Sequence, residues 1–429
     1  VDGVLYTAVK TRDGGRVLRW TGTVDDPFQW EEVGVLDAEG AELAVHDGRL
    51  FVTTWWNELG VQMAGLWMSP ELGSDGLRPS DAGLWEKVWA VDDYEPDEAI
   101  AYSYFGGALH SYGGDLYWGT INFPLVSLGA HVLLRGLDVQ QDLPAILAAL
   151  VPSYRTISIH RGRHFDDPRK KKIEVLYGER ELFAWEDGRW TLRRNATGVP
   201  RYGHSGFGNL FNAYTWTMGI YDGQLFVGTF DWSFLVGRVA RLLADALGVP
   251  QEEILDRLPF AATVGADLWR FPNRRSPAIP ESLGGVGNNA NYGIRTMLAR
   301  DEALYLGTAN PMNLLTDPDD ALPEGGWELL ALRRRAHDRF PVLAPAVAAA
   351  AEYALIWNGP IDNGIETRIP GFFAGSAGEQ NVGVHLVIGD AAAWDSCTHR
   401  VDLGEIRRSG YDGTVVLDIG GLIEQPPFY

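Results

Sequence analysis

A short two-strand unit recurs along the chain, and it constrains the fold more than any other feature of the sequence. Each copy has two runs of alternating apolar residues around Asp-Gly, Gly-Gly or a related turn, and the second run mostly ends in Gly-Thr or Thr-Thr. Alternation with a period of two predicts half-buried strands, and a two-residue turn of this kind predicts a tight hairpin. The copies are ELAVHDGRLFVTTWWN (42–57), ALHSYGGDLYWGTIN (108–122), TMGIYDGQLFVGTFD (217–231) and TMLARDEALYLGTAN (296–310), with a half copy at VDGVLYTAV (1–9) and a weaker one at YDGTVVLDIG (411–420).

Further strand-like segments follow most of these hairpins. AGLWMS (64–69), ADLWRF (266–271) and WELLAL (327–332) read as third strands, and LWEKVWAV (84–91) reads as a fourth. Four antiparallel strands repeated with glycine-rich turns are typical of the blades of a β-propeller, which must stack on one another to bury their faces. We therefore expect an all-β fold, a single β-propeller domain over residues 1–429 with seven four-stranded blades, or six as the alternative. The half copy at the start predicts that a C-terminal strand closes the ring and removes the open sheet edges.

Three segments interrupt the strand pattern. Their Leu, Ala and Val residues recur at helical spacing, which predicts helical insertions in the loops. These insertions either cap one end of the ring or fill the surface between blades. They lie near residues 140–153, 236–258 and 343–355.

The balance of charges restricts the partners of this protein. The 57 acidic and 36 basic residues give a formal net charge of −21. This surplus argues against nucleic acid and against an anionic membrane surface. The partner that we expect is a small-molecule substrate. No apolar run reaches the roughly 18 residues that a membrane-spanning helix needs. The sequence indicates no particular oligomeric state.

Cysteine and histidine usage narrows the compartment and the metal chemistry. The single cysteine, Cys397, excludes a disulfide within the chain and a cysteine-rich zinc site. We expect the cytoplasm, with secretion as the alternative if an N-terminal signal precedes Val1. The nine histidines show no HxH or HExxH spacing, so no histidine-bound metal is expected.

The ends of the second strands predict where a site would form. In a propeller these ends and the loops that enter the first strands meet at one mouth of the central channel. Polar groups among apolar walls are typical of a small-molecule pocket, although an Asn after a strand is often only a turn former. The predicted substrate-binding residues at this mouth are Trp56, Asn57, Asn122, Tyr214, Trp216, Phe230, Trp232, Tyr292 and Asn310.

Three residues at this mouth are candidates for catalysis. Asp231 lies between Phe230 and Trp232, and desolvation by such neighbours raises the pKa of a carboxylate toward that of a general base. Arg295 enters a first strand, where it would hold an anion or form an ion pair with Asp231. His204, in the glycine-rich stretch RYGHSGFGNLF (201–211), is a candidate acid or base.

The stretches GFGNLFNAYTWTMGIYDGQLFVGTFD (206–231) and YGIRTMLARDEALYLGTANPMNLL (292–315), with GGWELLAL (325–332), carry a resemblance to known proteins. They resemble bacterial kelch-like propeller proteins and, more distantly, the propeller part of the cyanobacterial enzymes that alkylate resorcinols in cylindrocyclophane assembly. The resemblance covers about residues 195–332. It implies an aromatic nucleophile that is held by a carboxylate and attacks an alkyl halide, with an arginine near the departing anion. Asp231 and Arg295 match these residue types.

We therefore expect a small-molecule enzyme with one site at the mouth of the propeller channel, which forms carbon–carbon or carbon–oxygen bonds by alkylating a hydroxyl-bearing nucleophile. One alternative is a hydrolase or lactonase with calcium as its cofactor, ligated by Asp231 together with Asn57, Asn122 and Asn310. Another is a non-enzymatic propeller that binds a peptide, a glycan or a protein at the same mouth.

Overall fold

The computed structural model describes most of the chain up to residue 333, and beyond that the backbone of several strands. Packing divides the chain into two compact units, residues 1–215 with 237–259 and residues 216–236 with 260–429. We describe each unit by itself, so the single domain expected over residues 1–429 stays a prediction. The described residues are 1, 3–55, 62–139, 141–256, 264–300, 302–310, 326–334, 351–360, 381–388, 399–407 and 415–417.

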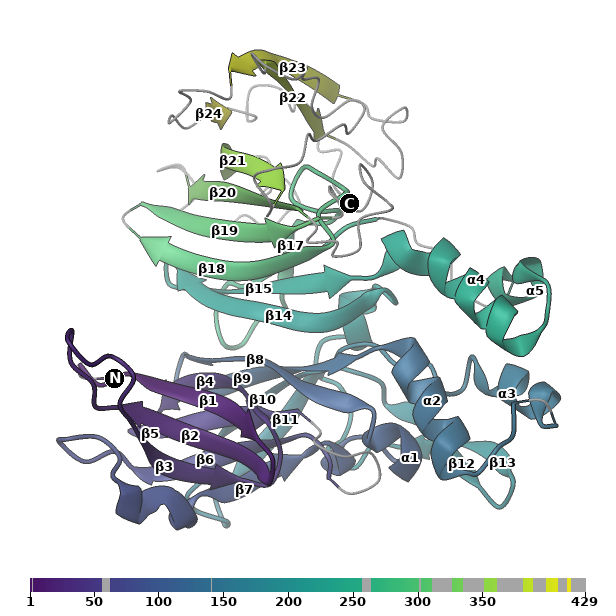
Figure 1. Ribbon diagram of the computed structural model, residues 1–429, viewed down its shortest axis with the longest axis horizontal. Helices are drawn as coiled ribbons and strands as arrows, with labels where there is room; N and C mark the ends of the chain where they lie inside the picture. Colours follow the sequence, from purple (N-terminus) through teal and green to yellow (C-terminus); the bar gives the residue numbers. More distant parts are fainter. Residues whose placement is uncertain are drawn as a thin grey trace. The chain divides into compact units, whose positions relative to one another are not determined.

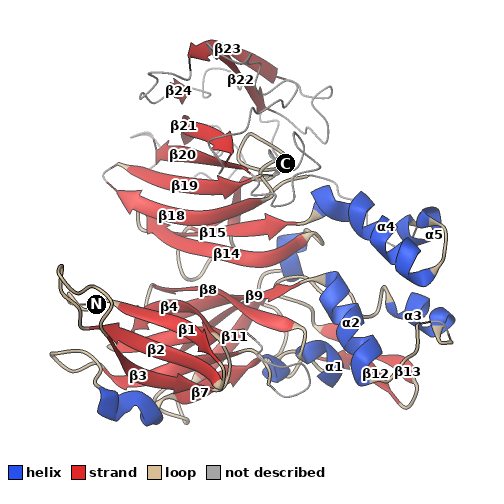
Figure 2. Ribbon diagram, in the orientation of Figure 1, coloured by secondary structure: helices blue, strands red, loops and turns tan. Residues whose placement is uncertain are grey.

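Strands dominate both units (Figure 2). Neighbouring strands within the sheets named below pair antiparallel. This confirms an all-β fold with few helices. In the first unit the strands are β1 (Tyr6–Thr11), β2 (Gly14–Trp20), β3 (Trp30–Leu36), β4 (Gly40–His46), β5 (Arg49–Thr54), β6 (Gly65–Glu71), β7 (Glu86–Ala90), β8 (Tyr104–Tyr112), β9 (Asp115–Asn122), β10 (Ile159–Arg163), β11 (Lys172–Tyr177), β12 (Glu181–Glu186) and β13 (Arg189–Arg194). The strands that follow are β14 (Asn212–Tyr221), β15 (Gln224–Asp231), β16 (Leu268–Phe271), β17 (Ile279–Ser282), β18 (Gly293–Arg300), β19 (Ala303–Ala309), β20 (Gly326–Arg334), β21 (Ala351–Pro360), β22 (Asn381–Ile388), β23 (His399–Arg407) and β24 (Val415–Leu417).

Consecutive strands pair side by side as meanders. β4 to β7 form a four-stranded sheet, and β8 to β11 pair in the same sequential order (Figure 1). In the second unit β15, β16 and β17 pair in sequence, as do β18, β19, β20 and β21. These meanders agree with the strand order expected inside a blade. Their arrangement around one axis, and a count of six or seven, stay predictions.

The predicted hairpin turns owe their shape to residues that tolerate a positive φ angle. Asp47 and Gly48 have φ angles of 46° and 70°, and Asp222 and Gly223 have angles of 49° and 70°. Two positive φ angles in succession define the turn whose twist matches the flanking strands. The ladder then closes directly on either side of the first turn, where His46 pairs with Arg49.

The cores follow from the alternation of the strands. In the first unit, β9 is buried along its whole length because β8 and β10 flank it and other side chains cover both of its faces. Trp118 on β9 packs with Trp89, Tyr94 and Phe165 in one cluster. In the second unit, a separate cluster joins Phe226, Leu268, Ile294 and Leu306. Burial of these alternating apolar side chains provides the main driving force for each sheet.

The helices lie between strands and pack mostly on one another in the first unit. They are α1 (Glu98–Ala101), α2 (Pro124–Leu134), α3 (Leu143–Ala149), α4 (Val236–Leu247) and α5 (Gln251–Leu255), with 3₁₀ turns η1 (Pro79–Leu84), η2 (Val91–Asp93), η3 (Ser205–Gly208) and η4 (Ser233–Leu235). Helix α3 lies within the segment 140–153, and α4 and α5 lie within 236–258. Ile146 of α3, Ala240 of α4 and Ile254 of α5 share one apolar cluster. No helix of the described part of the chain is long and apolar enough to span a bilayer.

The third predicted helical segment is in part a strand. Residues 351–355 begin β21, which pairs with β20 along its length, so the helix expected over 343–355 is wrong there. Helix propensity is a weak preference that pairing with an available strand edge overrides. Residues 343–350 lie outside the described residues.

Candidate functional site

The predicted site residues fall into three groups. Trp56 and Asn57 lie outside the described residues. Asn122, His204 and Tyr214 belong to the first unit. A shared mouth between the two units therefore stays a prediction. The remaining predicted residues belong to the second unit and are Trp216, Phe230, Asp231, Trp232, Tyr292, Arg295 and Asn310.

Three of the predicted aromatic residues form one cluster in the second unit. The ring centroids of Trp216 and Phe230 lie 5.4 Å apart, and those of Phe230 and Tyr292 also lie 5.4 Å apart. Phe234 of η4, which the sequence did not single out, stacks on Tyr292 at 4.6 Å with an interplanar angle of 12°. Gly293 makes room for the cluster, because a Cβ atom there would lie 1.9 Å from the Trp216 ring.

Asp231 is buried beside this cluster, and the backbone around it explains its position. Its side chain is fully buried, and its Oδ1 accepts a hydrogen bond of 2.8 Å from the N–H of Ser233, at the start of η4. Its own N–H donates to the carbonyl of Tyr292 at 2.7 Å. Trp232 is also buried, at 4% exposure. The carboxylate therefore has a structural task in this turn whatever its catalytic role.

Arg295, which we expected to hold an anion or to pair with Asp231, contacts an aromatic ring. Its guanidinium lies over the ring of Trp216, with 5.2 Å between the guanidinium carbon and the ring centroid. Burial raises the pKa of the nearby Tyr292, and the charge of Arg295 opposes that rise. An ion pair between Arg295 and Asp231 stays a prediction. Arg295 is exposed, which leaves its charge open to an anion.

Asn122 and Asn310 use their amides within the protein. The Nδ2 of Asn122 donates to the Ser103 hydroxyl at 3.1 Å, and its Oδ1 accepts from the Ser127 hydroxyl at 2.8 Å. The Nδ2 of Asn310 donates to Oδ1 of Asn291 at 3.1 Å. Tyr214 pairs with Ile121 at the end of β9. Both amides thus take part in hydrogen bonds with other side chains. The described residues hold no group of three or more His, Cys, Asp and Glu placed to bind a metal.

His204 has a carboxylate partner that the sequence did not predict. Its Nδ1 lies 3.0 Å from Oε2 of Glu179, and its side chain is 81% exposed while that of Glu179 is 31% exposed. The other oxygen of Glu179 accepts from the hydroxyl of Ser205 at 2.8 Å and from its N–H at 3.2 Å. Since a carboxylate only accepts, Nδ1 of His204 donates this hydrogen bond.

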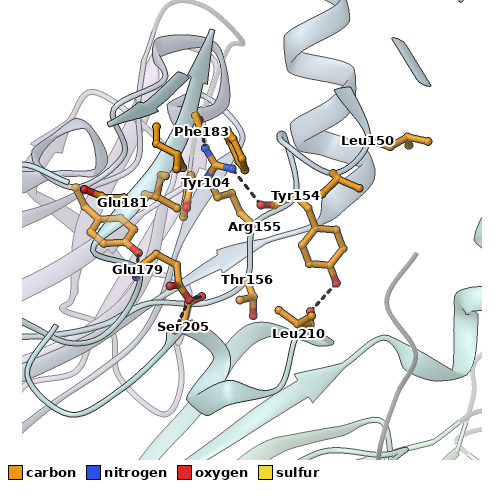
Figure 3. Close-up of a pocket in the computed structure, with 14 residues that line it drawn as sticks. Tyr104, Leu150, Tyr154, Arg155, Thr156, Glu179, Glu181, Phe183, Ser205 and Leu210 are labelled. Carbon is orange, nitrogen blue, oxygen red and sulfur yellow. Dashed lines mark hydrogen bonds between the residues drawn. The ribbon is translucent and has the colours of Figure 1, made fainter. Parts of the chain in front are cut away.

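Glu179 and Ser205 line a pocket of about 430 Å³ in the first unit (Figure 3). The segment after α3, the connection from β11 into β12, and the loop around η3 supply most of its walls. In Figure 3, Glu179 and Ser205 lie at one end and Tyr154 with Leu210 lie at the other. Apolar and aromatic groups form most of the lining, as in sites that bind small molecules. The complete lining is Tyr94, Tyr104, Leu150, Val151, Tyr154, Arg155, Thr156, Glu179, Glu181, Leu182, Phe183, Leu192, Ser205 and Leu210.

Arg155 forms part of the wall, and an ion pair holds it there. Its Nε and Nη2 donate to the two carboxylate oxygens of Glu95 at 2.6 and 2.9 Å, and both side chains are buried. Burial by itself disfavours the charge, but Glu95 raises the pKa of Arg155 above its usual value. The two residues therefore form a charged, bidentate ion pair that holds Arg155 in the wall of the pocket.

The sequence held only one signal for this pocket. His204 and Ser205 stood out in a glycine-rich loop, whereas Glu95, Arg155 and Glu179 belong to no recurring unit or motif. The fold brings Glu95 to Arg155, and Arg155 and Glu179 into the lining of one pocket, although the three residues are distant in the sequence.

Comparison with known proteins gives only remote similarities. No family model and no curated protein matches the sequence. Among solved structures, the chain is similar to an α-L-arabinofuranosidase from Clostridium thermocellum, at 8% identity and a TM-score of 0.30, over 78% of this chain and 91% of that one. It is similar to a puromycin-hydrolyzing peptidase of Mycobacterium tuberculosis, at 10% identity and a TM-score of 0.32, over 89% of this chain and 49% of that one. It is also similar to an inulosucrase from Halalkalicoccus jeotgali bound to kestose, at 13% identity and a TM-score of 0.32, over 76% of each chain. Similarity at this level carries no functional argument, so the proposals below rest on this chain's own side chains.

Proposed function

We propose that this protein is a β-propeller enzyme that acts on a small molecule in the pocket of the first unit, with Glu179 and His204 as its acid–base pair. The observation that carries the proposal is the hydrogen bond of 3.0 Å between His204 and Glu179, a carboxylate that itself lines an apolar pocket. A carboxylate that orients an imidazole, or that takes a proton itself, is a recurrent device of acid–base catalysis.

The arrangement supports proton transfer and does not form a serine triad. Both the Ser205 hydroxyl and the His204 ring donate to Glu179, so no hydrogen bond links Ser205 to His204. Ser205 therefore holds the carboxylate in place, and Glu179 is the group that reaches the substrate. Removal of a positioned acid or base commonly costs on the order of 10²- to 10⁴-fold in rate.

Turnover measurements on matched variants test this proposal. Wild type, Glu179→Gln and His204→Asn are assayed with a panel of p-nitrophenyl esters, p-nitroanilides and p-nitrophenyl glycosides. His164→Asn is the control, because His164 is also exposed and has a φ angle of 53°, which Asn tolerates. We expect one substrate class to be turned over, with a loss of about 10²-fold or more in both site variants and no loss in the control. A panel without turnover, or turnover that both site variants keep, would overturn the proposal.

Alkylation at Asp231 is a second candidate function, favoured by the aromatic cluster of the second unit. Trp216, Phe230 and Tyr292 form a surface on which an aromatic nucleophile would stack. Asp231 would take the proton of its hydroxyl, and the exposed Arg295 would stabilise the departing anion.

A further inference from the structure

We infer that the pocket of the first unit selects an ammonium ion with an apolar body, such as an arylalkylamine. This inference rests on the site named in the proposed function and adds the class of its ligand. The structural basis is that donors of the lining are engaged with the protein while carboxylate acceptors face the pocket.

The guanidinium of Arg155 has no hydrogen left for a ligand. An arginine side chain carries five N–H donors. Nε and one N–H of Nη2 donate to the carboxylate of Glu95. The two N–H groups of Nη1 donate to the carbonyls of Pro152 and Tyr154 at 2.7 and 3.0 Å. The second N–H of Nη2 donates to the carbonyl of Phe183 at 2.6 Å. Arg155 is the one Arg or Lys in the lining, so the pocket offers an incoming carboxylate or phosphate no free cationic donor.

The hydroxyl groups of the lining are engaged in the same way. Tyr104 donates to Glu95 at 3.2 Å, and Tyr154 donates to the carbonyl of Leu210 at 2.5 Å. Thr156 donates to the carbonyl of Asn212, and Ser205 donates to Glu179. The hydroxyl of Tyr94 accepts from the N–H of Glu179 at 2.8 Å, which leaves its own proton as the one hydroxyl donor of the lining with no acceptor assigned. Apart from this Tyr94 proton, the side-chain donors named here are engaged, so a ligand that brings its own donors fits the pocket best.

The acceptors that remain are negatively charged. Glu179 uses Oε1 for the two bonds from Ser205 and Oε2 for the bond from His204, so Oε2 keeps an acceptor site. Glu181 lines the pocket as well, with a side chain that is 46% exposed and lies 3.8 Å from Arg194. Because Glu95 cancels the charge of Arg155 and Arg194 lies near Glu181, Glu179 is the main source of a negative potential in the pocket, which favours a cation.

The rest of the lining fits the apolar part of such a ligand. Phe183, Leu192 and Val151 line the pocket yet are 37%, 55% and 58% exposed, so apolar surface remains open there. The ring of Phe183 belongs to this open part of the lining, and aromatic rings attract ammonium groups. A volume of about 430 Å³ has room for a single ring with a short chain.

Calorimetric titration with three probes of similar shape tests the inference on the full-length protein. The probes are 2-phenylethylamine, 2-phenylethanol and 3-phenylpropionate at pH 7. We expect the amine to bind about tenfold more tightly than the alcohol, the combined effect of an ion pair and a cation–π contact, and the carboxylate to bind most weakly. Glu179→Gln is expected to remove most of the preference for the amine, and Glu186→Gln, an exposed carboxylate outside the lining, is expected to leave it unchanged.

Two further variants separate this inference from the proposed function. Leu210→Trp narrows the pocket at an exposed position and is expected to weaken all probes that bind there, while thermal unfolding shows that it is folded. His204→Asn is expected to keep the affinity for the amine while losing turnover. Equal binding of the three probes, or preference for the carboxylate, would overturn the ammonium inference and leave the acid–base proposal standing. Absence of binding, or binding that Leu210→Trp does not weaken, would overturn the inference together with the pocket as the site.

Discussion

Nδ1 of His204 lies 3.0 Å from Oε2 of Glu179, and this contact joins a loop residue to the connection between two strands 25 residues earlier. It converts an exposed histidine, which has no fixed orientation of its own, into a ring with a defined tautomer. The same carboxylate lines the pocket, so a substrate bound there would meet Glu179, whose Oε2 is bonded to the imidazole of His204. The predictions below concern the groups that hold this pocket and the aromatic cluster of the second unit.

Loss of the buried ion pair should destabilise the first unit. Arg155→Met leaves the carboxylate of Glu95 buried with only the N–H of Asp97 and the hydroxyl of Tyr104 as neutral partners. Removing one member of a buried pair costs about 3–5 kcal/mol. Chemical denaturation followed by circular dichroism measures this loss. The double variant Glu95→Gln with Arg155→Met should recover part of the lost free energy of unfolding. A loss below about 1 kcal/mol in Arg155→Met alone would contradict the role assigned to the ion pair.

Stability of the first unit should fall in acid because of His160. This ring is fully buried among Trp89, Trp118 and Tyr94, and burial lowers its pKa from 6.5 to about 3. The unfolded chain therefore takes up a proton before the folded chain does. The contribution of the buried His160 to the free energy of unfolding is fully present above pH 6.5. It is lost as the pH falls toward 3, at up to about 1.4 kcal/mol per pH unit.

A neutral replacement isolates the effect of His160. In His160→Gln the free energy of unfolding should depend less steeply on pH between 6.5 and 4, by up to about 1.4 kcal/mol per unit. Burial also lowers the pKa of His46 and His131, so part of the slope should remain. Denaturant titrations at several pH values provide the measurement, and parallel curves for wild type and variant would exclude His160 as the source.

Gly293 should be required for the aromatic cluster. In Gly293→Ala the new methyl group would lie 1.9 Å from the Trp216 ring, so the ring must shift from its present position. Overpacking of this kind costs about 1–3 kcal/mol and should shift the tryptophan fluorescence. Gly129→Ala is the control, because it lies in α2 with open space around its Cβ position and should stabilise by up to about 1 kcal/mol. An unchanged emission spectrum in Gly293→Ala would mean that the ring does not rest on this backbone.

Asp231→Asn separates the structural from the catalytic task of that residue. Asn keeps an oxygen that accepts the 2.8 Å bond from the N–H of Ser233, so the midpoint of thermal unfolding should change little. If Asp231 is a general base in alkylation, kcat should fall about 10²-fold or more with little change in KM. Kinetics with an alkyl halide and a resorcinol provide the test, and a full rate in the variant would remove Asp231 from the mechanism.

Local features made much of the secondary structure predictable. The turn at Asp222 and Gly223, and the alternating runs on either side, depend on neighbouring residues only, and the structure places β14 and β15 there. The helical spacing around residues 236–258 is equally local, and α4 and α5 lie there. Prediction went wrong at residues 351–355, because pairing with β20 decides that conformation and sequence periodicity does not report a pairing partner.

The candidate site shows the same division. By itself the sequence determined that His204 and Ser205 share a glycine-rich loop, that Phe230 and Trp232 flank Asp231, and that strands alternate, because these are properties of adjacent residues. Only the tertiary structure decided that Arg155 would reach Glu95, 60 residues away, that Glu179 would hold His204, and that Arg295 would stack on Trp216. The physical reason is that burial and hydrogen bonding select partners by distance in space, and the packing of sheets sets that distance without leaving a pattern in the chain.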